Sequence, residues 1–415
     1  MVRIFRLTFT FGLCFLVGLV ACQASAPASV PLPTVASIAL LANDTATPSG
    51  LVPPTYTPFP IAATLIPSPS PPRSELLTPT VGVLPTLTPI PPTVTPSITP
   101  TPTITPTATT VSMNDFGLDE PLPIEAYPRP ADDNGWGMHW IPTVKQEAAV
   151  VDRFVGEMVR MHIKWVVFLN DGTNIGDNDY LVDQLVANGI MPVMRLYRSD
   201  VTIYEGDLGA LVRHYRARGV YYYQLYNEPN VNGENNQGVA NPNQYATVWA
   251  VAARLVMENG GFPGFGSLSP GGAYNHYLYL ERVIQAIRHN GDVTLLNRAW
   301  VSVHNYHGTR PHDDPDGFLM FRNYDEIVQA RLGRSLPMIG TEGGSYSTDV
   351  NVEQSLIIYQ YGYMKEAEPY FFVFSYWLMA NAEGGSSDLA WEWQALFRAN
   401  YVHPVIADFF YRNKE

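Results

Sequence analysis

Short apolar runs alternate with segments of helical periodicity from residue 135 to the C-terminus, and this alternation constrains the fold more than any other feature. The expected strands are residues 135–140, 165–169, 191–197, 221–228, 264–268, 299–306, 336–342 and 370–377. The expected helices are residues 151–158, 180–187, 208–218, 245–257, 277–289, 324–332 and 353–364. Continuously apolar strands are typical of parallel sheets covered on both faces, so the pattern predicts a (β/α)8 TIM barrel. The alternative, an open doubly wound sheet, requires a Gly-rich phosphate turn after its first strand, and the chain offers none there.

Residues 1–22 resemble a bacterial lipoprotein signal peptide. Arg3 and Arg6 precede an apolar run that ends in small residues directly before Cys22. The run is shorter than the ~20 residues that a transmembrane helix needs. We expect lipidation of Cys22 after cleavage, with an ordinary secretory signal or an uncleaved anchor as the alternatives. Cys14 leaves with the signal, so the mature chain cannot form an internal disulfide.

Residues 23–112 are rich in proline and threonine and nearly uncharged. Proline removes backbone donors and favours extended polyproline II, so this segment cannot build a packed core. We interpret it as a disordered stalk rather than a repeat-built binding module, because no aromatic residue lies between Phe59 and Phe116. An anchor and a stalk predict an extracytoplasmic domain, residues 113–415, that is lipid-anchored at the cell envelope or cell surface.

The chain carries a net charge of −13, and almost all of it belongs to residues 113–415. A strongly acidic surface disfavours nucleic acid and anionic lipid as partners, because both are negatively charged. Neutral polymers are not repelled. We therefore expect no nucleic-acid partner, membrane contact only through the N-terminal lipid anchor, and a monomer.

Two glutamates are the first candidates for chemistry, because each ends an apolar strand. Glu228 follows a tyrosine-rich strand and precedes Pro229, which interrupts strand hydrogen bonding. Glu342 ends the expected strand 336–342. The carboxyl ends of parallel barrel strands meet at one face, where barrel enzymes place their chemistry, so the two acids can converge on one pocket.

Four strand ends carry a family resemblance. They are Asn227-Glu228-Pro229, His304-Asn305-Tyr306, Glu342 and Trp377, at the ends of expected strands four, six, seven and eight. In this order they resemble the retaining glycoside hydrolases of clan A, which include cellulase-like, mannanase-like and β-xylosidase-like barrels. The resemblance implies cleavage of O-glycosidic bonds in a polysaccharide or oligosaccharide by double displacement. It makes Glu228 the general acid and base, and Glu342 the nucleophile.

Six further residues are candidates for substrate binding: Asn227, His304, Tyr306, Trp377, Arg195 and His139. Asn227 resembles the family amide that contacts a sugar hydroxyl beside the cleaved bond; its alternative role is a turn former before proline. His304 and Tyr306 lie two apart, so they project to the same face of a strand and can donate hydrogen bonds to Glu342.

The other candidates have structural alternatives. Arg195 and Arg198 are equally good sources of positive charge beside Glu342, and either can instead form a surface ion pair. Trp377 is either an aromatic floor under a sugar ring or a core residue. His139 is more often a core histidine than a ligand-binding one, and the two tryptophans that flank it are candidates for lining a subsite.

The chain departs from the family pattern after the expected nucleophile. Many members place Trp or Phe there, whereas Gly343 and Gly344 follow Glu342 in this chain. We expect the glycines to open space in the pocket.

Two rival functions remain. A metal-dependent barrel hydrolase would draw on His139, His304, His307 and Asp388, but His304 and His307 are three apart and face opposite sides of a strand. A non-catalytic glycan-binding barrel lipoprotein would keep both carboxylates without turnover. We expect an enzyme that needs neither a metal nor an organic cofactor.

Overall fold

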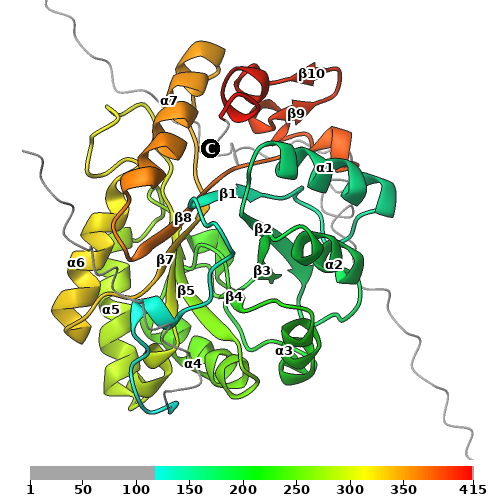
Figure 1. Cartoon of the computed structure of the whole chain (residues 1–415). Coiled ribbons are helices and arrows are strands. Elements are labelled where there is room, and N and C mark those ends of the chain that lie inside the picture. Colours follow the sequence, from blue (N-terminus) through cyan, green and yellow to red (C-terminus); the bar gives the residue numbers. More distant parts are fainter. Residues whose placement is uncertain (1–116, 414–415) are drawn as a thin grey trace, which may run out of the picture. The chain divides into compact units, whose positions relative to one another are not determined.

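The computed structural model describes residues 117–413, which form a closed barrel of parallel strands in the order β1 to β8, with β1 paired to β8 (Figure 1). The strands are β1 Trp136–His139, β2 Trp165–Asp171, β3 Met191–Tyr197, β4 Tyr222–Leu225, β5 Phe262–Leu268, β6 Trp300–His304, β7 Met338–Glu342 and β8 Phe371–Tyr376. The helices are α1 Ala148–Arg160, α2 Asp179–Ala187, α3 Leu208–Ala217, α4 Pro242–Glu258, α5 His276–His289, α6 Met320–Leu332 and α7 Val350–Tyr363. The predicted (β/α)8 fold is therefore confirmed. The predicted signal peptide, Cys22 and the stalk lie outside the described residues.

Predicted and observed strands agree because every strand is buried on both faces, which makes its sequence continuously apolar. The run 191–197 coincides with β3. The exception is β4, which ends at Leu225 and not at Glu228. The chain therefore leaves the sheet before it reaches the first acid.

Large side chains fill the barrel interior near the beginnings of the strands. The interior cluster includes Trp165, Tyr222, Phe262, Trp300 and Phe372. Buried Trp and Tyr side chains usually find hydrogen-bond partners for their polar atoms. Here Trp300 Nε1 donates to the Phe262 carbonyl at 2.9 Å, and the Tyr222 hydroxyl donates to the Pro128 carbonyl at 2.6 Å. This end of the barrel is thus a packed core.

The segment before β1 packs into the same interior cluster. The short 3-10 helix η4, Ile124–Ala126, leads into Tyr127, whose ring lies 5.0 Å from that of Phe262. The Tyr127 hydroxyl donates to the Ala299 carbonyl at 3.1 Å. The segment around η4 thus covers the amino ends of the strands. The polar pocket lies at the opposite, carboxyl end.

Short segments complete the chain: η5 Asn232–Glu234, η6 Val293–Asn297, η7 Met364–Glu366, η8 Ala382–Gly384, η9 Glu392–Gln394, β9 Phe397–Arg398, β10 Tyr401–Val402 and the π-helix η10 Ile406–Phe410. The buried Glu353 of α7 connects the C-terminal part to the barrel. It accepts a hydrogen bond from the Tyr376 hydroxyl, and one of its oxygens lies 3.2 Å from His403 Nε2. None of the helices in residues 117–413 combines the length and apolar character needed to cross a bilayer.

Candidate active site

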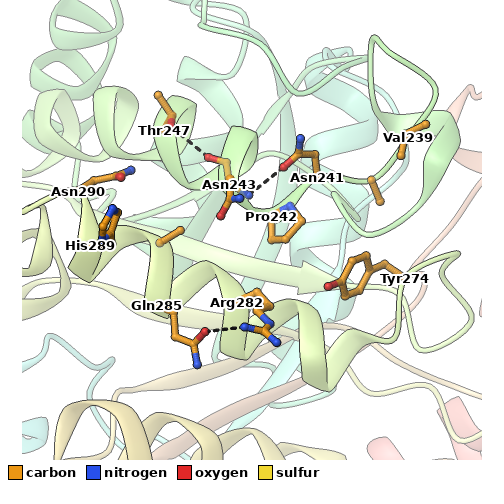
Figure 2. Close-up of a pocket in the computed structure, with 12 residues that line it drawn as sticks. Val239, Asn241, Pro242, Asn243, Thr247, Tyr274, Arg282, Gln285, His289 and Asn290 are labelled. Atoms are coloured by element: carbon orange, nitrogen blue, oxygen red, sulfur yellow. Dashed lines mark hydrogen bonds between the residues drawn. The ribbon is translucent and has the colours of Figure 1, made fainter.

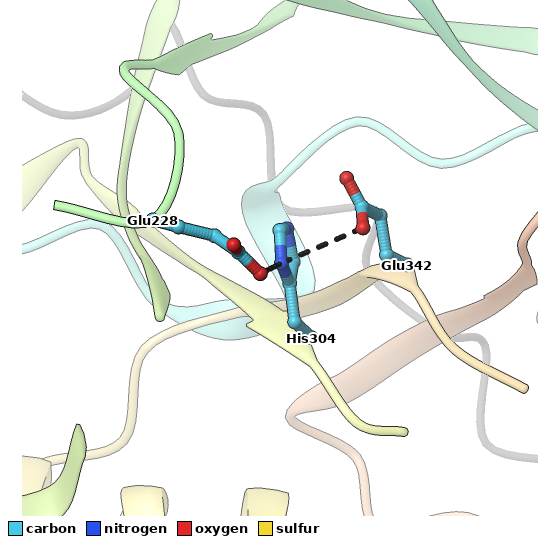
Figure 3. A group of neighbouring side chains, drawn as sticks. All are labelled: Glu228, His304 and Glu342. Carbon is cyan, nitrogen blue, oxygen red and sulfur yellow. Dashed lines mark hydrogen bonds and ion pairs between the residues drawn. The ribbon is translucent and has the colours of Figure 1, made fainter. Parts of the chain in front are cut away.

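Glu228 and Glu342 meet across one imidazole ring. His304 Nδ1 lies 3.0 Å from Glu228 Oε1 and 3.7 Å from Glu342 Oε2. Figure 3 shows both carboxyl groups directed at this ring, and one oxygen of each acid lies within 4.8 Å of the other and of the nitrogen. The ends of β4, β6 and β7 therefore place two acids and a histidine in one pocket.

Glu228 sits on a turn after β4. The backbone φ angles of Tyr226 and Glu228 are 65° and 37°, in the left-handed region that costs energy for residues other than glycine. The Glu228 N–H donates to the Ser267 carbonyl at 2.9 Å, which fixes the turn to β5. Sequence reasoning missed this reversal because no glycine or asparagine marks either position.

Glu342 is 7% exposed and paired on both oxygens. Arg195 donates to Oε1, and the Tyr306 hydroxyl donates to Oε2 at 2.8 Å. Burial alone would raise the pKa of the Glu342 carboxyl, but its electrostatic interactions with His304 and Arg195 and the hydrogen bond from Tyr306 outweigh burial. They hold the pKa well below its usual range, so Glu342 is ionised at neutral pH.

Of the two candidate arginines, only Arg195 reaches Glu342. Arg198 binds Asp200 at 2.9 Å and Thr202 instead. Arg195 lies within β3, where the alternation of side chains fixes which face it occupies. Arg198 lies beyond the end of the strand, so this alternation does not apply to it.

Trp377 and His139 form a buried pair beside Glu342, with their ring planes tilted by 58°. Their ring centroids are 4.2 Å apart, and His139 Nδ1 lies 3.0 Å from the Trp140 carbonyl. Burial lowers the pKa of His139 to about 3, so its ring is neutral at pH 7. Trp377 Nε1 and His139 Nε2 are buried and have no hydrogen-bond partner in residues 117–413, which leaves two nitrogens for a bound hydroxyl.

The two tryptophans that flank His139 do not line the pocket, so that interpretation is wrong. Trp136 packs against Phe409 and donates from Nε1 to the Tyr361 carbonyl at 2.9 Å. Trp140 packs against Phe154 of α1. Both alternate with His139 along the chain and therefore point outward, toward the surrounding layer.

The expectation that Gly343 opens space in the pocket is also wrong. A Cβ atom at this position would lie 2.4 Å from Cε2 of Phe374, so the neighbouring ring already fills that space. The carbonyls of Gly343 and Gly344 accept hydrogen bonds from the N–H groups of Trp377 at 2.7 Å and His307 at 2.8 Å. The glycines therefore permit close packing that positions the residues after β6 and β8.

Three residues at the site were not singled out from the sequence. Tyr346 stacks on Tyr306, with centroids 5.5 Å apart, and is 56% exposed. Trp391 lies 5.7 Å from Trp377 and is 40% exposed. Both extend the aromatic surface outward from the buried rings of Tyr306 and Trp377. In the sequence, only the closeness of Tyr346 to Glu342 marks either residue as a candidate.

The third missed residue is Glu234, at the end of η5. Its half-buried carboxyl interacts electrostatically with Arg195, Glu228 and Glu342. Burial, reinforced by the two other acids, raises the pKa of Glu234 to about 7. A third carboxyl group, which the sequence did not predict, therefore acts electrostatically on the acid pair.

Glu228, His304 and Glu342 are the one group in residues 117–413 whose donor atoms are close enough to coordinate a metal ion. A divalent cation would have to compete with Arg195 and Tyr306 for both oxygens of Glu342. The donor set therefore fits a cation poorly.

A cavity of about 810 Å³ lies between α4 and α5 and contains none of these residues (Figure 2). Arg282 donates to Gln285 at 3.2 Å, and Asn241 caps α4 through the Asn243 N–H. We assign the chemistry to the carboxylate pocket instead.

The fold and the site together define a (β/α)8 barrel with a carboxylate pair at the ends of β4 and β7. No model of a known protein family and no curated protein matches the chain. It is similar to the solved structure of a family 39 glycoside hydrolase from Bacteroides cellulosilyticus, with a TM-score of 0.49 and 15% identity, covering 68% of this chain and 64% of that chain.

Two further solved structures are similar over much of the barrel. One is the endo-β-1,4-mannanase from Thermotoga petrophila, with a TM-score of 0.43 and 11% identity, covering 70% of this chain and 79% of that chain. The other is a family 128 exo-β-1,3-glucanase from Aureobasidium namibiae, with a TM-score of 0.39 and 14% identity, covering 63% of this chain and 97% of that chain. Likenesses this distant carry no argument about the reaction, so the case for a function rests on the site.

Proposed function

We propose that this protein is a retaining glycoside hydrolase that cleaves β-linked poly- or oligosaccharides. The observation that carries the proposal is the acid pair: Glu228 and Glu342 have oxygens within 4.8 Å of each other. Retaining glycosidases hold their two carboxyl groups about 5 to 5.5 Å apart, whereas inverting enzymes need about 6.5 Å or more to admit a water.

The proposed reaction has two steps. A Glu342 oxygen attacks the anomeric carbon while the protonated Glu228 gives its proton to the departing glycosidic oxygen. The glycosidic bond breaks and a glycosyl ester of Glu342 forms. Glu228, now a carboxylate, then takes a proton from water, whose oxygen attacks the same carbon and releases Glu342.

The surrounding contacts suit these roles. Arg195 and Tyr306 keep Glu342 ionised and aimed. In the tautomer with the proton on Nδ1, His304 donates to Glu228 Oε1 whether that carboxyl group is protonated or not, so the bond can hold the carboxyl in place through both steps. The proposal assigns sugar binding to Asn227, His139 and Trp377, and outer sugar residues to the exposed rings of Tyr346 and Trp391.

Location follows from the N-terminal sequence. A lipid on Cys22 and a stalk over residues 23–112 would present the domain to polymers outside the cell. Fractionation of cells that make the full chain should recover it with the envelope. Intact protein in the cytoplasmic fraction would contradict this part of the proposal.

The test of the reaction is a pair of substitutions, Glu228→Ala and Glu342→Ala, assayed on a panel of aryl β-glycosides and polysaccharides. We expect both to lose at least about a thousandfold in kcat, because each removes one of the two groups that make and break bonds. Glu326→Ala, on the exposed face of α6, is the matched control and should retain activity.

Full activity of Glu342→Ala would overturn the nucleophile assignment. Glycan binding by the wild-type protein without turnover of any substrate would indicate the non-catalytic alternative. Loss of activity on treatment with a chelator would revive the metal-dependent hydrolase.

A further inference from the structure

The chain after β8 turns back and packs against the residues of the carboxylate pocket. The Leu396 N–H donates to the Leu378 carbonyl at 3.1 Å, which pairs the segment after η9 with the segment after β8. Ala395, directly after η9, belongs to one hydrophobic cluster with Tyr306 and Trp377. The turn that contains η9 therefore lies against side chains at the ends of β6 and β8.

Trp391 is the exposed ring of this turn. It directly precedes η9, and its centroid lies 5.7 Å from that of Trp377, with the two rings at 84°. Trp391 is 40% exposed, whereas Trp377 is buried. Tyr306, in the cluster of Trp377, bonds Glu342. An exposed aromatic face this near the acid pair offers an apolar surface for a sugar ring next to the one that is cleaved.

The turn is fixed by a buried acid of α7, Glu353, which has no part in the proposed reaction. Glu353 accepts a hydrogen bond from the Tyr376 hydroxyl, and the same hydroxyl lies 3.0 Å from the Gln394 carbonyl of η9. All three residues are buried, so solvent does not reach these contacts freely. Since Tyr376 ends β8, one hydroxyl group connects α7, β8 and η9.

Two side chains from the C-terminal part contact the other oxygen of Glu353. Arg398 Nη2 lies 3.8 Å from Oε2, and His403 Nε2 lies 3.2 Å from it. Arg398 also donates from Nε to the Ala395 carbonyl at 2.8 Å, which connects it to the same turn. Buried ionic groups often add little net stability, and fixing one geometry is a role attested for some of them.

The acid pair is held independently of Glu353. Arg195 and Tyr306 bond the Glu342 carboxylate, and the Trp377 N–H donates to the Gly343 carbonyl at 2.7 Å. Loss of the Glu353 carboxyl should therefore displace the turn of η9 while the reacting groups stay in place.

We propose that Glu353 is a positioning residue that holds η9 so that Trp391 forms an outer sugar subsite, and that this subsite makes the protein favour long glycan chains over small glycosides. The inference rests on the proposed function, which assigns outer sugar residues to the ring of Trp391. Glu353 touches no substrate and acts through Tyr376 and Arg398.

The test compares two substrates of the same sugar and linkage, a long oligosaccharide and an aryl monoglycoside, with the full chain. In Glu353→Leu, kcat/KM for the oligosaccharide divided by kcat/KM for the aryl glycoside should fall roughly tenfold, as for the loss of one sugar–aromatic contact. The aryl glycoside value itself should change less than about threefold. Tyr376→Phe removes only the connecting hydroxyl and should lower the ratio too, so it serves as the test if Glu353→Leu does not fold.

The matched controls are Glu368→Leu and Tyr363→Phe. Glu368 likewise accepts a hydrogen bond from a tyrosine, Tyr363, at 2.7 Å and pairs with an arginine, Arg322, at 2.6 Å. This group precedes β8 and lies at the opposite, amino end of that strand. Both control variants should keep the ratio of the wild-type protein.

A double-mutant cycle distinguishes positioning from a general structural role. Trp391→Ala should lower the ratio by itself, and adding Glu353→Leu should lower it by less than about twofold more, because the acid acts through this ring. Independent losses that multiply would overturn the inference. So would an equal loss of kcat/KM for both substrates in Glu353→Leu.

Calorimetry with the same oligosaccharide separates this inference from the proposed function. The wild-type protein should bind it roughly tenfold more tightly than Glu353→Leu does. Binding with this difference but no hydrolysis would sink the proposed function and leave the outer subsite standing. Hydrolysis that depends on Glu342 but shows no preference for the oligosaccharide would sink the inference alone.

Discussion

At the scale of single residues, the ionised state of Glu342 depends on a few donors. The Tyr306 hydroxyl is one of two groups that bond its carboxylate directly. Tyr306→Phe keeps the ring that stacks on Tyr346 and removes only this bond. A hydrogen bond to a charged group contributes about 1.5–3 kcal/mol, so we expect kcat to fall roughly 10- to 150-fold in a variant that still folds.

Steady-state kinetics and a thermal melt check this prediction. Tyr180→Phe is the control, because its hydroxyl bonds Asp152 on the surface. Unchanged kcat in Tyr306→Phe would show that the bond does not matter in the transition state.

The raised pKa of Glu234 also makes the stability of the folded protein depend on pH. Its pKa is raised from 4.5 to about 7 in the folded protein, with burial as the largest cause. The folded state therefore binds this proton more tightly than the unfolded state, and the resulting stability is present below pH 4.5 and lost as pH rises through 7. Glu234→Gln should remove this loss.

The measurement is the melting temperature of Glu234→Gln minus that of the wild-type protein at several pH values. This difference should increase between pH 4.5 and about pH 8. A difference that stays constant with pH would contradict the raised pKa.

At the scale of elements, Gly343 connects β7 to the packing of β8. Gly343→Ala places a methyl group 2.4 Å from a ring carbon of Phe374, which is itself buried. We expect overpacking to cost about 1–3 kcal/mol, measured by denaturant unfolding. Gly156→Ala in α1 is the control: its Cβ meets nothing within 4 Å, so it should be neutral or stabilising. Equal stability of both variants would contradict the close-packing account.

The elements themselves could be predicted because burial on both faces of a strand leaves a continuous apolar run. The convergence of Glu228, His304 and Glu342 could be predicted too, because parallel strands end at one face. The backbone reversal at Tyr226 could not, since a left-handed tyrosine is held by tertiary contacts and has no local signal. Periodicity also says nothing of where a loop residue such as Glu234 will point.

At the scale of the whole described domain, the two ends of the barrel differ in composition: one is packed with aromatic residues and the other carries the acids. The amino ends of the strands are sealed by aromatic packing against the segment around Tyr127. The carboxyl ends hold the three acids, Arg195 and the exposed aromatic rings. The aromatic packing and the acid pair thus lie at opposite ends of one barrel, the arrangement typical of TIM-barrel enzymes.

The measurement that tests the central claim most directly is covalent trapping on the acid of β7. The full chain is incubated with an activated 5-fluoro β-glycoside of the sugar that it hydrolyses fastest, and the product is analysed by intact-protein and peptide mass spectrometry. Fluorine slows both steps, so the ester should accumulate as one added glycosyl unit on the peptide that contains Glu342. A glycosyl unit on any other residue, or hydrolysis with inverted anomeric configuration and no adduct, would contradict the account.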